Sequence, residues 1–271
     1  FRAYIRLKVD TGKIDDARNL LTEFMAIYSG QALLEADMAN LMQDGALDPL
    51  VNSPTEGIGD GIFHVASAIY QQSRELGFLY ARLSHWVAPD MPNAKIFIAG
   101  VMEDHQRYED ANVVYDSLAK NSPYAWSVRL QQAENLYALD DADQAIKILS
   151  AMVKERPGHF DALVSLGDIY RKQERFAEAA DTFDKAISRL NPVKSEHFYI
   201  FYYAGMTHER AKQWDQAEPN FLKALELRPG NPNMLNYLGY SWVDQGKKYK
   251  EAKAMLERAV ELRPNDGYII D

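Results

Sequence analysis

Residues 163–187 read LVSLGDIYRKQERFAEAADTFDKAI, and residues 201–229 read FYYAGMTHERAKQWDQAEPNFLKALELRP. The two segments share one pattern of small residues, with a bulky phenylalanine among them at Phe183 or Phe221. The small residues are Gly167, Ala179 and Ala186 in the first segment and Gly205, Ala217 and Ala224 in the second. Glycine or alanine at a helix crossing lets two backbones approach closely, whereas a larger side chain holds them apart. The pattern therefore predicts pairs of closely packed antiparallel helices.

The same pattern recurs along the chain at intervals of about 34 residues. A proline commonly closes each interval, as at Pro123, Pro157, Pro229 and Pro264. In length and signature the interval resembles the tetratricopeptide repeat (TPR), whose unit is one helix-turn-helix. The resemblance implies an all-α solenoid of antiparallel helix pairs that forms a right-handed superhelix with a concave groove.

The register of this repeat predicts how the chain is divided. Residues 1–47 are expected to form partial or degenerate TPR-like helices, including a helix from Gln31 to Leu47. Residues 48–61 hold two prolines and three glycines, which predicts a loop or hinge. Residues 62–91 are expected to form a degenerate repeat. Residues 92–271 are expected to form five units and the start of another, the units being 92–125, 126–159, 160–197, 198–231 and 232–266.

Composition and charge exclude several functions. The formal net charge is -9, and no cluster of lysine and arginine suited to phosphate is visible, which argues against a nucleic-acid partner. Cysteine is absent, so disulfides, thiolate zinc sites and cysteine nucleophiles are excluded. No apolar run approaches the roughly 20 residues of a membrane span. Because the chain begins at Phe1 and stops inside a repeat, it is expected to be a fragment of a longer protein.

The sequence shows no pattern typical of catalysis or of a cofactor. The six histidines include no pair at the i, i+4 spacing of a helical zinc site, so no metal is expected. The glycines from Gly57 to Gly61 are followed by no lysine and preceded by no strand, which favours a linker over a phosphate loop. No nucleophile motif is present. The chain is therefore predicted to be a non-enzyme without a cofactor.

The TPR resemblance implies where a partner would bind. In that family the first helix of each unit lines the groove at fixed positions, and tyrosine with asparagine suits a peptide or a helix laid there. The alternative is that the tyrosines only pack against neighbouring helices. The basic pair of the carboxylate clamp found in some TPR proteins is missing at these positions. The predicted site comprises Tyr199, Tyr202, Tyr203, Met206, Arg210, Asn233, Asn236, Tyr237 and Tyr240.

These expectations combine into one function with two alternatives. The chain is predicted to be a TPR scaffold or adaptor that holds a protein or peptide partner in its groove. It could instead be the substrate-recruiting arm of a larger enzyme, or a solenoid that self-associates through an uncapped end. The run LNYLGYSWVDQGK from Leu235 resembles the C-terminal repeats of large alphaproteobacterial TPR proteins. That resemblance implies a role in a bacterial envelope or periplasm, with the cytoplasm as the alternative.

Overall fold

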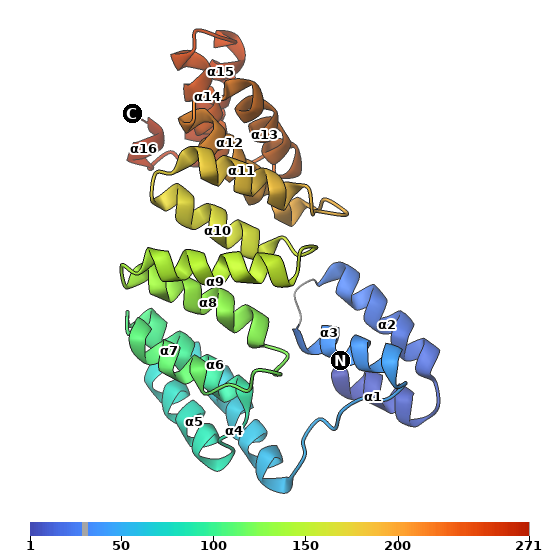
Figure 1. Cartoon of the computed structure of the whole chain (residues 1–271). Coiled ribbons are helices and arrows are strands. Elements are labelled where there is room, and N and C mark those ends of the chain that lie inside the picture. The colour runs from blue at the N-terminus through green and yellow to red at the C-terminus, as the bar shows by residue number, and fades with distance from the viewer. Residues whose placement is uncertain (29–31, 271) are drawn as a thin grey trace. The chain divides into compact units, whose positions relative to one another are not determined.

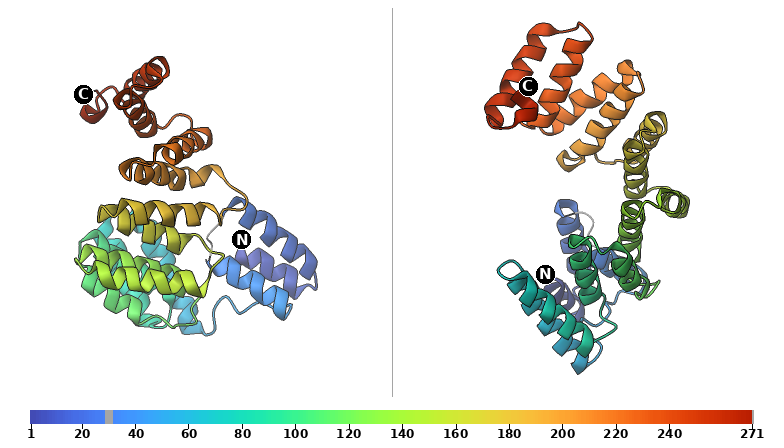
Figure 2. Two further views of the ribbon diagram at one scale, coloured as in Figure 1. Left: turned by 45° about the horizontal axis from the view of Figure 1, so that its top comes forward. Right: turned by 90° about the vertical axis from the view of Figure 1, so that its left-hand side faces the viewer.

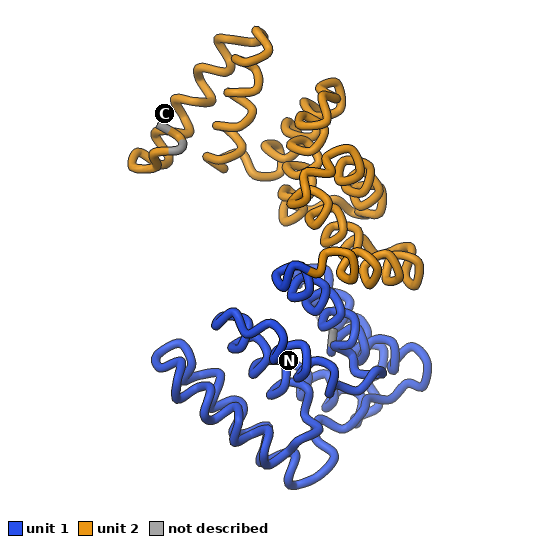
Figure 3. The backbone as a smooth tube through the Cα atoms, turned by 60° about the vertical axis from the view of Figure 1, so that its left-hand side comes forward, with its two compact units in different colours: residues 1–140 blue, residues 141–271 orange. Residues whose placement is uncertain are grey.

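The computed structural model describes residues 1–28 and 32–270, and in this part of the chain the regular structure is entirely helical (Figure 1). The chain divides into two compact units, Phe1–Asp140 and Asp141–Asp271 (Figure 3). Among the helices of the described residues, none combines the length and the apolar character that crossing a bilayer requires. The fold is all-α, and most of its helices follow one another as packed pairs.

The first unit contains eight described helices. They are α1 (Arg2–Asp10), α2 (Ile14–Ile27), α3 (Ala32–Gln43), α4 (Pro54–Tyr70), α5 (Arg74–Val87), α6 (Pro92–Asp104), α7 (Tyr108–Asp116) and α8 (Ala125–Ala138). Helices α1 to α3 enclose a small core of their own around Ile5, Leu21 and Leu41. Helices α4 to α8 pack in sequence, each against the next.

The second unit also contains helix pairs. It contains α9 (Ala142–Glu155), α10 (Asp161–Lys172), α11 (Phe176–Ile187), the 3₁₀ turn η1 (Ser195–His197), α12 (Phe198–Arg210), α13 (Trp214–Leu227), α14 (Pro232–Asp244), α15 (Tyr249–Leu262) and the short α16 (Gly267–Ile270). The pairs α10 with α11, α12 with α13 and α14 with α15 lie one after another (Figure 2). Each predicted unit from residue 160 onward contains one such pair.

The turn between the two helices of a pair has a recurrent geometry. Asp140, Glu174 and Lys212 lie in the left-handed region, with φ of 63°, 58° and 62°. Each follows the last turn of a first helix, where a left-handed residue lets the next amide bond back to the helix carbonyls. Arg175 N–H, for example, donates to Tyr170 O at 2.9 Å. The chain then enters the second helix within two residues.

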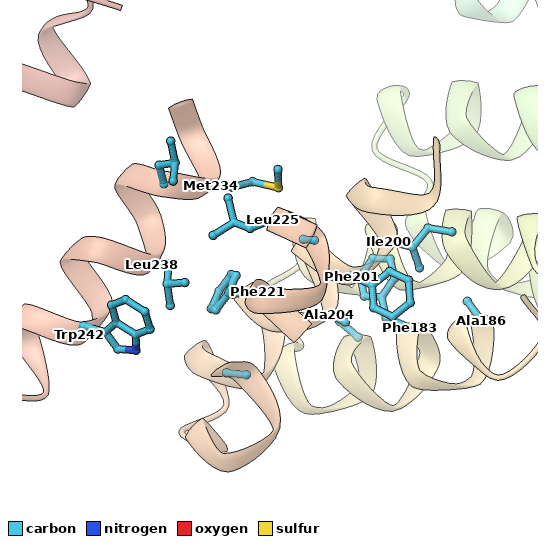
Figure 4. Close-up of a cluster of buried hydrophobic side chains, with 14 of the residues drawn as sticks. Phe183, Ala186, Ile200, Phe201, Ala204, Phe221, Leu225, Met234, Leu238 and Trp242 are labelled. Atoms are coloured by element: carbon cyan, nitrogen blue, oxygen red, sulfur yellow. The ribbon is translucent and has the colours of Figure 1, made fainter. Parts of the chain in front are cut away.

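The core of the second unit explains the spacing of small and large residues. Phe183 and Phe221 are almost fully buried (Figure 4). A Cβ atom on Gly167 would lie 3.2 Å from the Phe183 ring, and one on Gly205 would lie 2.7 Å from the Phe221 ring. In these two pairs the first helix therefore packs its glycine directly on the phenylalanine of the second helix, because no side chain separates them.

The predicted loop over residues 48–61 is wrong in its second half. Helix α4 begins at Pro54, and Ser53 Oγ accepts a hydrogen bond from Glu56 N–H at 3.1 Å. Asn52 N–H donates to the Glu56 carboxylate at 2.6 Å, so this helix start is capped from both sides. Gly59 lies where α4 meets α5, because a Cβ there would be 2.5 Å from that of Ala88.

The helix predicted from Gln31 to Leu47 corresponds to α3, which ends at Gln43. Arg2 forms an ion pair with Asp37 of this helix, with 2.6 Å between Nε and Oδ2. Ser29, Gly30, Gln31 and Asp271 lie outside the described residues.

Candidate partner-binding surface

The predicted site residues belong to α12 and α14, the first helices of two successive pairs in the second unit. Helix α12 carries Tyr199, Tyr202, Tyr203, Met206 and Arg210. Helix α14 carries Asn233, Asn236, Tyr237 and Tyr240. Helix α13 contacts both α12 and α14, and α10 also contacts α12. The surface is thus formed by first helices, with second-helix side chains beneath them.

Three of the predicted tyrosines form one cluster. Tyr202 lies between the other two, with ring centroids 5.6 Å from Tyr203 and 6.0 Å from Tyr237. All three are half-buried. We call Tyr202, Tyr203 and Tyr237 the tyrosine cluster.

The tyrosine cluster packs directly on the core phenylalanines. The ring of Phe221 lies 6.1 Å from Tyr202 and 5.3 Å from Tyr237, and Phe183 is stacked 6.0 Å from Tyr203. One face of each tyrosine therefore stabilises the helix stack. Packing against neighbouring helices is part of their role, but it leaves each ring partly accessible.

The hydroxyl groups of Tyr237 and Tyr203 differ in their environment. Tyr237 donates to Glu209 Oε2 at 3.0 Å. Burial and the Glu209 carboxylate raise the pKa of Tyr237 above its ordinary value, so its proton stays in place. Tyr203 has no hydrogen-bond partner among the described residues, and its hydroxyl is not buried. Tyr203 therefore keeps a donor and an acceptor for another molecule.

A cation stacks on the ring of Tyr203. The guanidinium carbon of Arg171, from α10, lies 4.8 Å from the ring centroid. Asp168 holds Arg171 in place, with Nε and Nη2 at 2.9 and 2.6 Å from Oδ1. This contact is a cation–π interaction that fixes the tyrosine ring. The residue pattern does not reveal it, because the contact depends on the rotation of α12 relative to α10.

The remaining predicted residues surround the tyrosine cluster. Tyr240 is 43% exposed. Arg210 is exposed, its guanidinium lies 4.6 Å from the centroid of Phe176, and it has no ion pair within the described residues. Asn233 is exposed and accepts a hydrogen bond from Arg263 at 3.2 Å. Tyr199 and Met206 are half-buried against the core, and burial raises the pKa of Tyr199.

The prediction that Asn236 belongs to the partner-binding surface is wrong, because this residue is only 2% exposed. Helix α14 is in contact with α13, α15 and α16, and so has little free surface at this position. The amide oxygen of Asn236 is buried without a hydrogen-bond partner. Its side chain cannot present an amide to a partner in this conformation.

A separate hollow of about 310 Å³ lies between α9, α10 and α11. Its walls include Leu166 and Tyr170 with the charged residues Lys154, Glu178 and Lys185. It belongs to the second unit but shares no residue with the tyrosine cluster, and so forms a distinct surface.

Comparison with known proteins agrees with the fold and the repeat pattern. The tetratricopeptide repeat family matches residues 130–193 and 202–267. The crystal structure of the APC/C hetero-tetramer Cut9–Hcn1 superposes with a TM-score of 0.60 over 95% of this chain and 51% of that chain, at 14% identity. The likeness to Cut9–Hcn1 concerns the fold alone. The chain belongs to the tetratricopeptide repeat family.

Two curated relatives match longer stretches of sequence. The human protein O-mannosyl-transferase TMTC1 is 31% identical over 163 residues, which is 59% of this chain and 18% of the relative. Anaphase-promoting complex subunit 3 of Schizosaccharomyces pombe is 24% identical over 205 residues, which is 74% of this chain and 29% of the relative. The chain therefore spans less than a third of either relative. Its fold is that of a protein-interaction scaffold.

Proposed function

We propose that this chain is a non-catalytic scaffold that binds a peptide or helix of a partner protein across α12 and α14. The observation that carries the proposal is the tyrosine cluster. Its rings pack on Phe183 and Phe221 and remain half-exposed. Tyrosine and arginine are enriched among the residues that contribute most to protein interfaces. Here the exposed Tyr240 and Arg210 flank the cluster on the same two helices.

Preorganisation supports binding at this surface. Rings fixed by Phe183, Phe221 and Arg171 lose little conformational freedom when a partner covers them. An unclamped surface of long, flexible side chains would lose more. A partner therefore encounters apolar faces and a free hydroxyl that are already in place.

The charges at this surface indicate the partner's character. Arg171 and Lys172 both form an ion pair with Asp168, while Arg210 has no ion pair within the described residues. The Glu209 carboxylate already accepts the Tyr237 hydroxyl. We therefore expect the bound segment to place an acidic group beside Arg210 and an apolar or aromatic side chain on the tyrosine cluster.

A selection of random peptides on phage tests this proposal. A peptide enriched on the wild-type chain is expected to bind Tyr240→Ala and Arg210→Ala at least about fivefold more weakly, since each removes an interface side chain of about 1 kcal/mol or more. The control is Tyr249→Ala, because Tyr249 is 62% exposed on the second helix α15. Fluorescence anisotropy measures the affinities. Equal binding by all four proteins would move the partner to another surface, such as the hollow beside α10.

A second candidate function rests on the match to an O-mannosyl-transferase. That match involves only 18% of the relative, so repeats like these form one part of a larger protein there. This chain would then recruit a substrate for a catalytic region elsewhere in the same polypeptide. The length and content of the full reading frame decide between an adaptor and such an arm.

A further inference from the structure

Helix α5 carries a row of exposed apolar side chains. Leu76, Leu79, Tyr80, Leu83 and Trp86 are 48%, 61%, 36%, 42% and 78% exposed. Their spacing places them on one side of the helix, because residues three, four and seven apart share a face. We call these five residues the α5 stripe.

The α5 stripe is unusual because the other side of α5 is already packed. Gly77, Ala81 and Ser84 are buried, and the carbonyl of Gly59 on α4 accepts the Ser84 hydroxyl at 2.7 Å. An amphipathic helix that already packs one face on its neighbours normally exposes polar side chains on the opposite face. The stripe therefore indicates that a further element covers α5.

The position of α5 in the helix series explains why this face is open. Helices α4 and α5 form the first pair of the series from α4 to α8, and α6 packs on α5 from one side (Figure 1). Ile58 and Val65 on α4 are also exposed, at 59% and 44%. Terminal pairs of a solenoid need a polar outer face for solubility, and this pair has an apolar one.

We propose that a second copy of this chain covers the α5 stripe, with the two α5 helices packed antiparallel around a two-fold axis. Leu76, Leu79, Leu83 and Trp86 are separated by three, four and three residues, which is the spacing of a coiled-coil seam. A seam of this kind requires a helix of the same period as its partner. Helix α5 of a second copy has this period. In a two-fold interface, the same patch of each copy contacts its counterpart on the other copy.

The exposed area is sufficient for a dimer. The five side chains of the α5 stripe expose on the order of 500 Å² of apolar surface, which is at the upper end of the largest apolar patch on a typical soluble monomer. Pairing two copies would bury on the order of 1,000 Å², the lower bound for a specific interface. A dimer removes the stripes of both copies from water. A polar surface of an unrelated protein would not do this.

The charges at the two ends of α5 favour the antiparallel arrangement. Arg74 opens the helix and Asp90 follows its end, both are exposed, and neither has an ion pair within the described residues. Antiparallel packing brings Arg74 of one copy near Asp90 of the other, whereas parallel packing places like charges together. Opposed helix dipoles add to this preference.

Sedimentation equilibrium of the full chain tests the dimer. The wild type is expected to be a dimer at tens of micromolar, and Leu79→Lys with Trp86→Glu is expected to be a monomer. The control is Val113→Lys, because Val113 is 70% exposed on α7 of the same unit and should leave the dimer intact. All changes lie on exposed positions, and circular dichroism verifies that helix content is kept. A monomeric wild type, or a dimer that survives the double change, overturns the proposal.

Cross-linking tests the orientation, because the chain contains no cysteine. The seam from Leu76 to Trp86 has its centre near Tyr80, so oxidation should link Tyr80→Cys to itself. Leu76→Cys should link to Trp86→Cys in a mixture but not to itself, because ten residues of helix separate the two ends by about 15 Å. Self-linking of Leu76→Cys, or no link at any position, would contradict the antiparallel pair.

Discussion

At the scale of single residues, the closest packing lies between glycine and phenylalanine. Gly205→Ala places a Cβ about 2.7 Å from the Phe221 ring, so the ring or the helix has to shift. We expect the free energy of unfolding to fall by about 1–3 kcal/mol, as measured by urea denaturation.

Gly100→Ala is the matched control for Gly205→Ala. Gly100 lies inside α6, and a Cβ atom added to it would meet nothing within 4 Å. This change should raise the free energy of unfolding by about 0.5–1 kcal/mol, since alanine favours the helix. An equal effect of both substitutions would show that helix propensity, rather than contact with Phe221, sets the cost.

His208 is a buried polar residue that links two pairs. Its Nε2 lies 3.0 Å from both carboxylate oxygens of Asp184, and its Nδ1 lies 2.8 Å from Oε1 of Gln213. Both partners present oxygen acceptors, so the protonated ring can donate from both nitrogens. Burial lowers the pKa of His208, but the hydrogen bonds to Asp184 and Gln213 and the Asp184 charge raise it more, and the net pKa is raised.

The raised pKa predicts how stability changes with pH. The folded chain binds this proton more tightly than the unfolded chain, whose histidine pKa is about 6.5. The stabilisation is therefore complete below about pH 6.5 and is lost as pH rises through the folded pKa. His85 and His197 have lowered pKa values and act in the opposite direction.

The contribution of His208 is therefore measured as the difference in the free energy of unfolding between the wild type and a His208 variant. The stability lost by His208→Gln, relative to wild type, should be larger at about pH 5.5 than at about pH 8.5. His105→Gln, at an exposed position, provides the reference in chemical denaturation at each pH. A loss that is the same at both values would show that the His208 contacts do not depend on its charge.

At the scale of elements, the start of α4 shows how a cap overrides composition. Two prolines and three glycines favour a loop, yet Ser53, Pro54 and Glu56 stand in the order of a helix start. Ser53→Ala should lower the free energy of unfolding of the first unit by about 1 kcal/mol. Thr55→Ala, an exposed change in the same turn, should have little effect. Thermal unfolding followed by circular dichroism compares the two, and similar losses would mean that the cap contributes nothing.

At the scale of the whole molecule, the two units each carry two tryptophans. Trp86 and Trp126 belong to the first unit, and Trp214 and Trp242 to the second. Repeat arrays are stabilised by contacts between neighbours, so a local change is felt most strongly nearby. Gly205→Leu should lower the unfolding midpoint reported by Trp214 and Trp242 more than that reported by Trp86 and Trp126.

Variants with one tryptophan pair replaced by phenylalanine separate the two fluorescence signals. Equal shifts of both midpoints would show that the chain unfolds as one cooperative body. A smaller shift of the midpoint reported by the first unit would show that the two units unfold with different stabilities.

The helix pairs and the residues that pack between them follow from the amino-acid sequence. The glycine and phenylalanine spacing is local to one pair, so the repeat pattern alone assigns Gly205 and Phe221 to a close contact. The tyrosines of α12 can likewise be placed on one face, because helical periodicity is a property of neighbouring residues. The start of α4 is not predicted in this way, because the prolines and glycines of that stretch are typical of a loop, and only the hydrogen bonds of Ser53 and Glu56 reveal the helix start.

Which of these side chains remain accessible depends on tertiary packing. Asn236 and Tyr237 are adjacent in the sequence, yet the first is buried and the second is half-buried, because α13, α15 and α16 surround α14 unevenly. The stacking of Arg171 on Tyr203 and the open face of α5 depend on how one pair is rotated against the next. That rotation is set by packing between segments far apart in sequence, which no local pattern records.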